Sequence, residues 1–246
     1  MSKILHMLDP RHHSRPSSQA LAFTTQAAVE SHKQPSHPSG PVNIVELFQS
    51  QGCNSCPPTN DALLDIIPQR PDVLVLTYDV TYWDYIGWKD VFGDKAFDER
   101  QRAYANRWQS NRVYTPQVIV NGRREAEGSG RVNQLIDQGI RAKEAGGQQV
   151  SMRLERNEVV VAGPDGSRGE VLAVFYDPSV HNVAVTRGEN RGATLRHQNV
   201  VRKVARLDAW VGGTQRYAIP DSGEGLRVAI LVQHGAGGRV LAALSV

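Results

Sequence analysis

The chain has 246 residues, of which 40% are hydrophobic and 22% are charged, and its formal net charge at pH 7 is +3. This composition is typical of soluble globular proteins, and the length allows either one large domain or two modest ones, of which we expect two. No run of Lys and Arg is long enough to indicate a nucleic-acid partner or an anionic membrane surface. No stretch of about 18 apolar residues is present, so we expect no membrane span.

Residues 1–41 are rich in Ser, Pro, Gln and His and show no sustained periodicity, which predicts a disordered N-terminal extension. Arg11 and Arg15, followed by the apolar run 20–23 and by Ala27 and Ala28, form a faint version of a signal peptide. The alternatives are an unstructured extension and a start site placed too far upstream.

The next segments alternate between strand and helix patterns. Residues 42–48 alternate apolar and polar side chains, as a strand does, and residues 59–67 have apolar side chains at helical spacing until Pro68. Residues 72–78 form a nearly continuous apolar run, which is typical of a central strand covered on both faces.

A helical insert is expected at about 79–113, with helical periodicity over residues 94–108. Residues 118–120 lead through Asn121-Gly122 into residues 123–126, which predicts a hairpin, and residues 130–145 predict a last helix. The order strand, helix, strand, helix, hairpin, helix is that of thioredoxin. It predicts an α/β thioredoxin-like domain over 42–146, with a mixed central sheet flanked by helices.

Residues 147–246 have a different texture, because short β-rich runs are separated by Gly, Pro, Asp and Asn. We expect them to form a second, β-rich and sandwich-like domain. Two polar segments in it, Arg187 to Gly192 and His197 to Asn199, are interpreted as a turn and as the lead into a strand.

The chain has two cysteines, Cys53 and Cys56, directly after the first predicted strand. So local a pair closes almost no loop and adds little stability, which favours reactivity over a structural role. A thiolate near a helix N-terminus is stabilised, so Cys53 is expected to attack a disulfide and Cys56 to resolve the mixed disulfide. Pro57 and Pro58 suit the first helical turn, where N–H groups lack partners.

Two alternatives to a redox pair remain open. The cysteines can be half of a zinc site, which needs two further ligands, although five of the eight histidines lie in the first 41 positions without a well-spaced second pair. They can also form a structural disulfide or a vestigial site. We predict no metal and no cofactor.

The predicted site also includes a proline and its neighbour, an acidic residue and a cluster of aromatic residues. Pro116 follows Thr115 just before a strand, the context in which thioredoxin-like proteins hold a cis proline, and Thr115 would then pair with an extended substrate. Glu46 is a candidate for relaying a proton, unless it lies on the wet side of an edge strand. The cluster Tyr82, Trp83, Tyr85 and Trp88 belongs either to the core or, if exposed near the cysteines, to an apolar rim for a peptide partner.

Read in order, several motifs resemble a bacterial family of unknown function, usually described as predicted secreted proteins with a thioredoxin-like fold. The motifs are Val45 to Phe48, the GCxxCPP motif from Gly52 to Pro58, Tyr82 to Trp88, Tyr114 to Gln117 and Arg187 to Asn190. The resemblance implies the fold, the cysteine pair and export to the periplasm or beyond, with a cytoplasmic location as the alternative. The chain departs from thioredoxin in having Gly52 before the first cysteine, where an aromatic residue is usual, and a longer interval before Thr115.

The leading hypothesis is therefore a thiol–disulfide oxidoreductase that acts on protein or peptide thiols with an unknown redox partner. Its site would consist of Cys53, Cys56, Pro116 and Glu46, with Thr115, Trp83, Tyr85 and Trp88 contacting the substrate. The rival hypothesis is a thioredoxin-like binding or scaffold protein whose cysteines are inert. The sequence does not indicate whether the pair oxidises or reduces its substrates.

Overall fold

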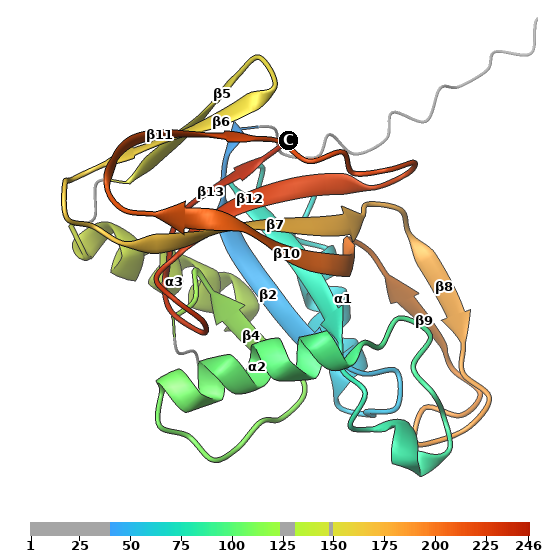
Figure 1. Ribbon diagram of the computed structural model, residues 1–246. Helices are drawn as coiled ribbons and strands as arrows, with labels where there is room; N and C mark the ends of the chain where they lie inside the picture. Colours follow the sequence, from blue (N-terminus) through green and yellow to red (C-terminus); the bar gives the residue numbers. More distant parts are fainter. Residues whose placement is uncertain (1–39, 124–130, 148–149) are drawn as a thin grey trace, which may run out of the picture. The chain divides into compact units, whose positions relative to one another are not determined.

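A computed structural model describes residues 40–123, 131–147 and 150–246 (Figure 1). Within these ranges, eight strands form one sheet in the order β1-β13-β12-β7-β10-β3-β2-β4. They are β1 Gly40–Pro41, β2 Asn43–Gln49, β3 Val73–Asp79, β4 Gln117–Val120, β7 Gly169–Asp177, β10 Val200–Trp210, β12 Arg227–Gln233 and β13 Val240–Ser245. Strands β2 and β3 are parallel, whereas β4 is antiparallel to β2.

The helices connect the strands of the first part of the sheet. Helix α1, Cys56–Leu64, follows β2 and carries two prolines in its first turn, where their missing N–H groups cost no hydrogen bonds. The 3-10 turn η1, Asp84–Ile86, and helix α2, Lys95–Arg107, lie between β3 and β4. Asp94 caps α2 by accepting a hydrogen bond from the backbone N–H of Ala96. Helix α3, Val132–Ala145, follows β4.

Alternation along β2 determines which side chains meet which helix. Ile44 and Phe48 belong to a buried cluster that includes Tyr104 of α2. Val45 and Leu47 belong to a different cluster, with residues of α1 and α3. Since successive side chains of a strand point to opposite faces, the helix that begins at Cys56 and the side chain of residue 46 lie on opposite faces of the sheet.

The boundary predicted at residue 146 does not separate two sheets. Strand β10 pairs with β3 in parallel at Val200 and Thr77, so the strands after residue 147 extend the sheet formed before it. The cluster that contains Ile44 and Phe48 also contains Leu172, Val174 and Leu231. The strands of residues 40–123 and those of residues 150–246 therefore form one continuous sheet (Figure 1). The physical reason is the hydrophobic core that the two ranges share.

The remaining described strands form two smaller sheets. Strands β5, Ser151–Glu155, β6, Glu158–Gly163, and β11, Gly213–Ala218, form a three-stranded sheet, and residues from β5 and β6 share a cluster with the second face of β7. Strands β8, His181–Ala184, and β9, Thr194–His197, form a hairpin. The sequence did not indicate β1, β9 or β11 as strands.

The predicted N-terminal extension overlaps the first strand of the sheet. Gly40 and Pro41 pair with β13, so the predicted extension 1–41 includes a short strand at its end. The rest of that extension, residues 1–39, and the predicted return strand at 124–126 lie outside the described residues. None of the helices in the described ranges is long and apolar enough to cross a membrane.

Candidate functional site

The two cysteines lie in a tight turn between β2 and α1. The backbone N–H of Cys53 donates to the carbonyl of Ser50 at 3.1 Å, and the N–H of Cys56 donates to the carbonyl of Cys53 at 3.3 Å. Ser55 is the N-cap residue and Cys56 is the first residue of α1, so Cys53 lies in the turn before the helix rather than within it. Both cysteines are buried free thiols.

The environment of Cys53 stabilises its thiolate. Hydrogen bonding from the Cys56 thiol contributes most and, together with hydrogen bonds from Ser55, lowers the pKa of Cys53 to about 6, against the opposing effect of burial. The Sγ of Cys53 lies 3.3 Å from the Oγ of Ser55. Hydrogen bonds from side-chain and backbone groups therefore stabilise the Cys53 thiolate, whereas the sequence pointed to the helix dipole.

The environment of Cys56 has the opposite effect. Burial raises the pKa of Cys56 far above its usual value, and the neighbouring Cys53 sulfur raises it further. At neutral pH the pair is therefore asymmetric, with a thiolate at Cys53 and a protonated thiol at Cys56. This is the order of reactivity that an attacking and a resolving cysteine need.

Thr115 and Pro116 lie beside Cys53, and the peptide bond between them is cis, as expected. The Cys53 thiol is within 3.6 Å of the carbonyl oxygen of Thr115. The indole N–H of Trp83 donates to the Thr115 hydroxyl at 2.8 Å. The structure therefore places Thr115 at the Cys53 sulfur and Trp83 at the Thr115 side chain.

The predicted aromatic cluster lies only partly in the core. Tyr85 is 81% exposed, and its ring stacks on that of Trp83, with centroids 6.3 Å apart. Tyr82 and Trp88 are half-buried, and the Trp88 indole donates to Gln51 Oε1 at 3.0 Å. Trp83 and Tyr85 thus form an apolar surface next to Thr115, and Trp88 holds the segment to the cysteine loop.

Gly52 makes room for a residue of this aromatic segment. A Cβ atom added at Gly52 would lie 3.0 Å from Cδ1 of Ile86, and one added at Gly188 would lie 2.9 Å from the same atom. Ile86 therefore packs between two glycines from distant parts of the chain. Because Gly52 has no side chain, the Ile86 side chain of η1 covers the position before Cys53 instead.

The segment at 187–192, interpreted from the sequence as a turn, contacts the cysteine loop directly. Asn190 Nδ2 donates to the carbonyls of Gln51 and Cys53, both at 2.9 Å. Glu189 Oε2 accepts from the backbone N–H of Asn54 at 3.2 Å. Sequence reasoning missed both residues, because nothing local in a polar turn indicates a partner more than a hundred positions away.

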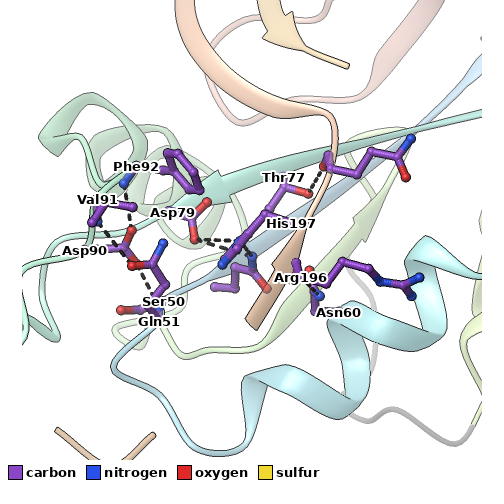
Figure 2. A network of polar contacts seen from close by, with 12 residues as sticks. Ser50, Gln51, Asn60, Thr77, Asp79, Asp90, Val91, Phe92, Arg196 and His197 are labelled. Carbon is purple, nitrogen blue, oxygen red and sulfur yellow. Dashed lines mark hydrogen bonds and ion pairs between the residues drawn. The ribbon is translucent and has the colours of Figure 1, made fainter. Parts of the chain in front are cut away.

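A buried polar network lies on the α1 side of the sheet, where β2, β3 and β9 end (Figure 2). Gln49 Nε2 lies 3.0 Å from Nδ1 of His197 and 3.4 Å from Oδ1 of Asp79. The three side chains are at most 2% exposed. Burial lowers the pKa of His197 to about 4, so the ring is neutral at pH 7. Burial also raises the pKa of Asp79 well above its usual value.

The sequence contains a signal for two members of this network. Gln49 and Asp79 both follow runs of apolar residues, and the strands that end at them are parallel neighbours. Because parallel strands end at the same edge of a sheet, their last side chains meet there. His197 carries no comparable signal.

Glu46 is not placed to serve the cysteines. It is buried on the face opposite α1, where its Oε1 accepts from Nε of Arg100 at 2.7 Å and its Oε2 accepts from the hydroxyl of Tyr104. It is also not on a wet edge, because β2 lies between β3 and β4. The sequence showed that residues 45 and 46 face opposite sides, but not which side α1 covers.

The zinc alternative needs ligands besides the two cysteines. Within the described ranges, no three His, Cys, Asp or Glu side chains come together as a metal site. A tetrahedral site needs four ligands, and a CxxC pair supplies two. The described residues around Cys53 offer hydrogen-bond donors and apolar surface instead.

Comparisons with known proteins identify relatives but no activity. The family described as "Protein of unknown function (DUF1223)" matches residues 44–233. The crystal structure of a protein from Agrobacterium tumefaciens is similar, with 30% sequence identity and a TM-score of 0.66, covering 86% of this chain and 95% of that chain. HBP35 of Porphyromonas gingivalis shares the fold, with a TM-score of 0.54 at 12% identity over 86% of this chain and 76% of that one. No curated protein matches the chain.

Proposed function

We propose that this chain, which belongs to the DUF1223 family of proteins of unknown function, is a thiol–disulfide oxidoreductase that acts on protein or peptide thiols. The observation that carries the proposal is the asymmetry of the two thiols, with the pKa of Cys53 lowered to about 6 and that of Cys56 strongly raised. An inert structural pair would have no need of this asymmetry. The arrangement of β2, α1, β3, β4 and α3 around the pair supports a thioredoxin-like reading of the fold.

The reaction follows from this asymmetry. The Cys53 thiolate attacks one sulfur of a substrate disulfide, which forms a mixed disulfide and expels the other sulfur as a thiolate. Cys56 then loses its proton and attacks the Cys53 sulfur, which forms the Cys53–Cys56 disulfide and expels the second substrate thiolate. The substrate gains two electrons and the cysteine pair loses two. The reverse sequence would oxidise a dithiol substrate, and a redox partner would restore the pair in either direction.

A substrate would approach beside Thr115. Trp83 and Tyr85 offer an exposed apolar surface next to the Thr115 carbonyl, which lies at the Cys53 sulfur. Peptides are commonly held by a backbone edge together with aromatic side chains. Because Cys53 is buried, the attacking substrate must displace the contact between its sulfur and the Thr115 carbonyl.

The test is to trap the mixed disulfide. The Cys56→Ser variant should form a stable mixed disulfide with a purified peptide disulfide, mapped to Cys53 by mass spectrometry, because the resolving thiol is missing. The matched Cys53→Ser variant should form none, since the remaining thiol is buried and protonated. The unaltered chain should reduce insulin with dithiothreitol as the electron source, and both variants should not.

The rival proposal is a scaffold that keeps the cysteines without using them. It predicts no adduct on Cys56→Ser and no insulin reduction by the unaltered chain. That pair of results would exclude the oxidoreductase.

A further inference from the structure

A cavity of about 380 Å³ opens beside Cys56, between α1 and β9. Cys56 and His197 both line it, so the two side chains face one space although they come from distant parts of the chain. Gln49, Ser50 and Asn60 add polar groups to its wall. A space of this size and polarity can hold several water molecules.

Two buried polar atoms on this wall lack hydrogen-bond partners among the described residues. They are Nε2 of His197 and Oδ1 of Asn60, and both side chains are at least nine-tenths buried. Unpaired buried polar atoms are costly, so their presence calls for a functional reason or for water. The other end of each side chain is fixed, because Nδ1 of His197 meets Gln49 and Nδ2 of Asn60 donates to the Arg196 carbonyl at 2.7 Å.

The proposed reaction leaves one proton without an acceptor. Cys56 must lose its proton as it attacks the mixed disulfide, and burial makes this loss difficult. The sequence suggested Glu46 for this role, but Glu46 is bound by Arg100 on the other face of the sheet. The acceptor must therefore be sought on the α1 side.

We propose that His197 is the proton-transfer residue for Cys56 and that it acts through water in the cavity between them. This inference rests on the proposed function. As the sulfur of Cys56 bonds to that of Cys53, the Cys56 proton passes through this water to Nε2 of His197. The substrate thiolate leaves with the electron pair of the broken S–S bond. The imidazolium then releases the proton to solvent through the same cavity.

The network around His197 suits this transfer. A neutral ring can accept a proton, and burial keeps the ring neutral at pH 7. The Gln49 amide has a donor at one end and an acceptor at the other, so by turning over it can accept from Nδ1–H and leave the lone pair at Nε2. Burial raises the pKa of Asp79, which disfavours a carboxylate that would hold the proton on the ring.

Other titratable or charged side chains lie around this network. They come from the segment before α2, from β7, β8, β9 and β10, and from α1: Asp90, Asp177, His181, Arg196, Arg202, Asp61 and Asp65. Arg196 pairs with Asp65 and Arg202 pairs with Asp177, so the exposed charges largely compensate one another. Among the described side chains that line the cavity, His197 is the one with a buried, unpaired ring nitrogen.

The experiment separates the two chemical steps in the full chain. Reduced protein is mixed with 5,5′-dithiobis(2-nitrobenzoate), whose coloured thiolate is released once when Cys53 attacks and again when Cys56 resolves. In His197→Gln we expect the rate of the second phase to fall about 100-fold at pH 7 and to increase with hydroxide concentration. The rate of the first phase should not change. His234→Gln is the control and should leave both phases unchanged, because His234 is exposed, contacts Arg107 and does not line the cavity.

A second variant guards against a folding defect. His197→Ala enlarges the cavity, and added imidazole should restore its second phase without changing its first. The proposal is overturned if His197→Gln leaves the second phase and its pH profile unchanged, or if both phases slow together and imidazole restores neither. If the unaltered chain itself shows no second phase, the proposed function fails instead.

Discussion

Asn190 donates its side-chain amide to the carbonyl of Cys53 at 2.9 Å, although the two residues lie 137 positions apart. The same nitrogen donates to the carbonyl of Gln51, also at 2.9 Å. The hairpin of β8 and β9 thereby fixes the backbone on which the cysteine pair is built. The shape of the candidate site depends on a part of the chain that looks from the sequence like a separate domain.

Replacing Asn190 with Ala should destabilise the protein. Two carbonyls of the cysteine loop lose their donor, and a hydrogen bond whose partner is left unpaired is worth about 1–3 kcal/mol. Urea denaturation measures the change. Asn182→Ala on the same hairpin is the control, because Asn182 is exposed, and equal effects of the two substitutions would contradict the role of Asn190.

The reactivity of Cys53 should follow its lowered pKa. The rate of alkylation by iodoacetamide should rise with pH to a plateau, with a midpoint near the pKa of about 6, because only the thiolate reacts. Cys56→Ala should move the midpoint upward, since it removes the strongest hydrogen bond to the thiolate, and Ser55→Ala should move it upward by less. A midpoint at the ordinary value for cysteine in the unaltered protein would refute this description of the site.

Glu46→Gln should affect stability and not thiol chemistry. It leaves the Arg100 guanidinium, whose side chain is 11% exposed, without its carboxylate, and breaking such a buried pair costs about 3–5 kcal/mol. The alkylation profile of Cys53 should stay the same. Glu155→Gln, which breaks exposed pairs with Arg153 and Arg216, should change stability little. If Glu46→Gln folds normally and shifts the alkylation profile, the catalytic role suggested by the sequence is correct after all.

Gly139→Ala should destabilise the protein even though alanine is the better helix former. A Cβ at Gly139 would stand 2.5 Å from two carbon atoms of Val120, so α3 would have to move away from β4. Overpacking of this kind costs roughly 1–3 kcal/mol, which exceeds the gain of about 1 kcal/mol in helix propensity. Thermal unfolding compares it with Gln138→Ala at an exposed position of the same helix. A higher midpoint for Gly139→Ala would show that the helix does not lie this close to the sheet.

Much of the first half of the fold followed from local pattern. The alternation in β2, the apolar run of β3 and the helical spacing in α2 and α3 each placed an element within a few residues. Helix α1 begins at Cys56, earlier than its apolar residues suggested, because two prolines can occupy a first turn without losing hydrogen bonds. The order of the elements then placed Thr115 and Pro116 next to Cys53.

The sequence by itself determined the cysteine pair, its place between a strand and a helix, and the proline that meets it, because spacing, turn residues and periodicity are properties of neighbouring residues. Only the tertiary structure decided that β10 joins β3, that Glu46 turns away from the cysteines, and that His197 and Asn190 turn toward them. These relations depend on which face of the sheet each helix covers and on pairing between distant strands. Local periodicity contains neither, because burial of a shared core selects them only when the whole chain is folded.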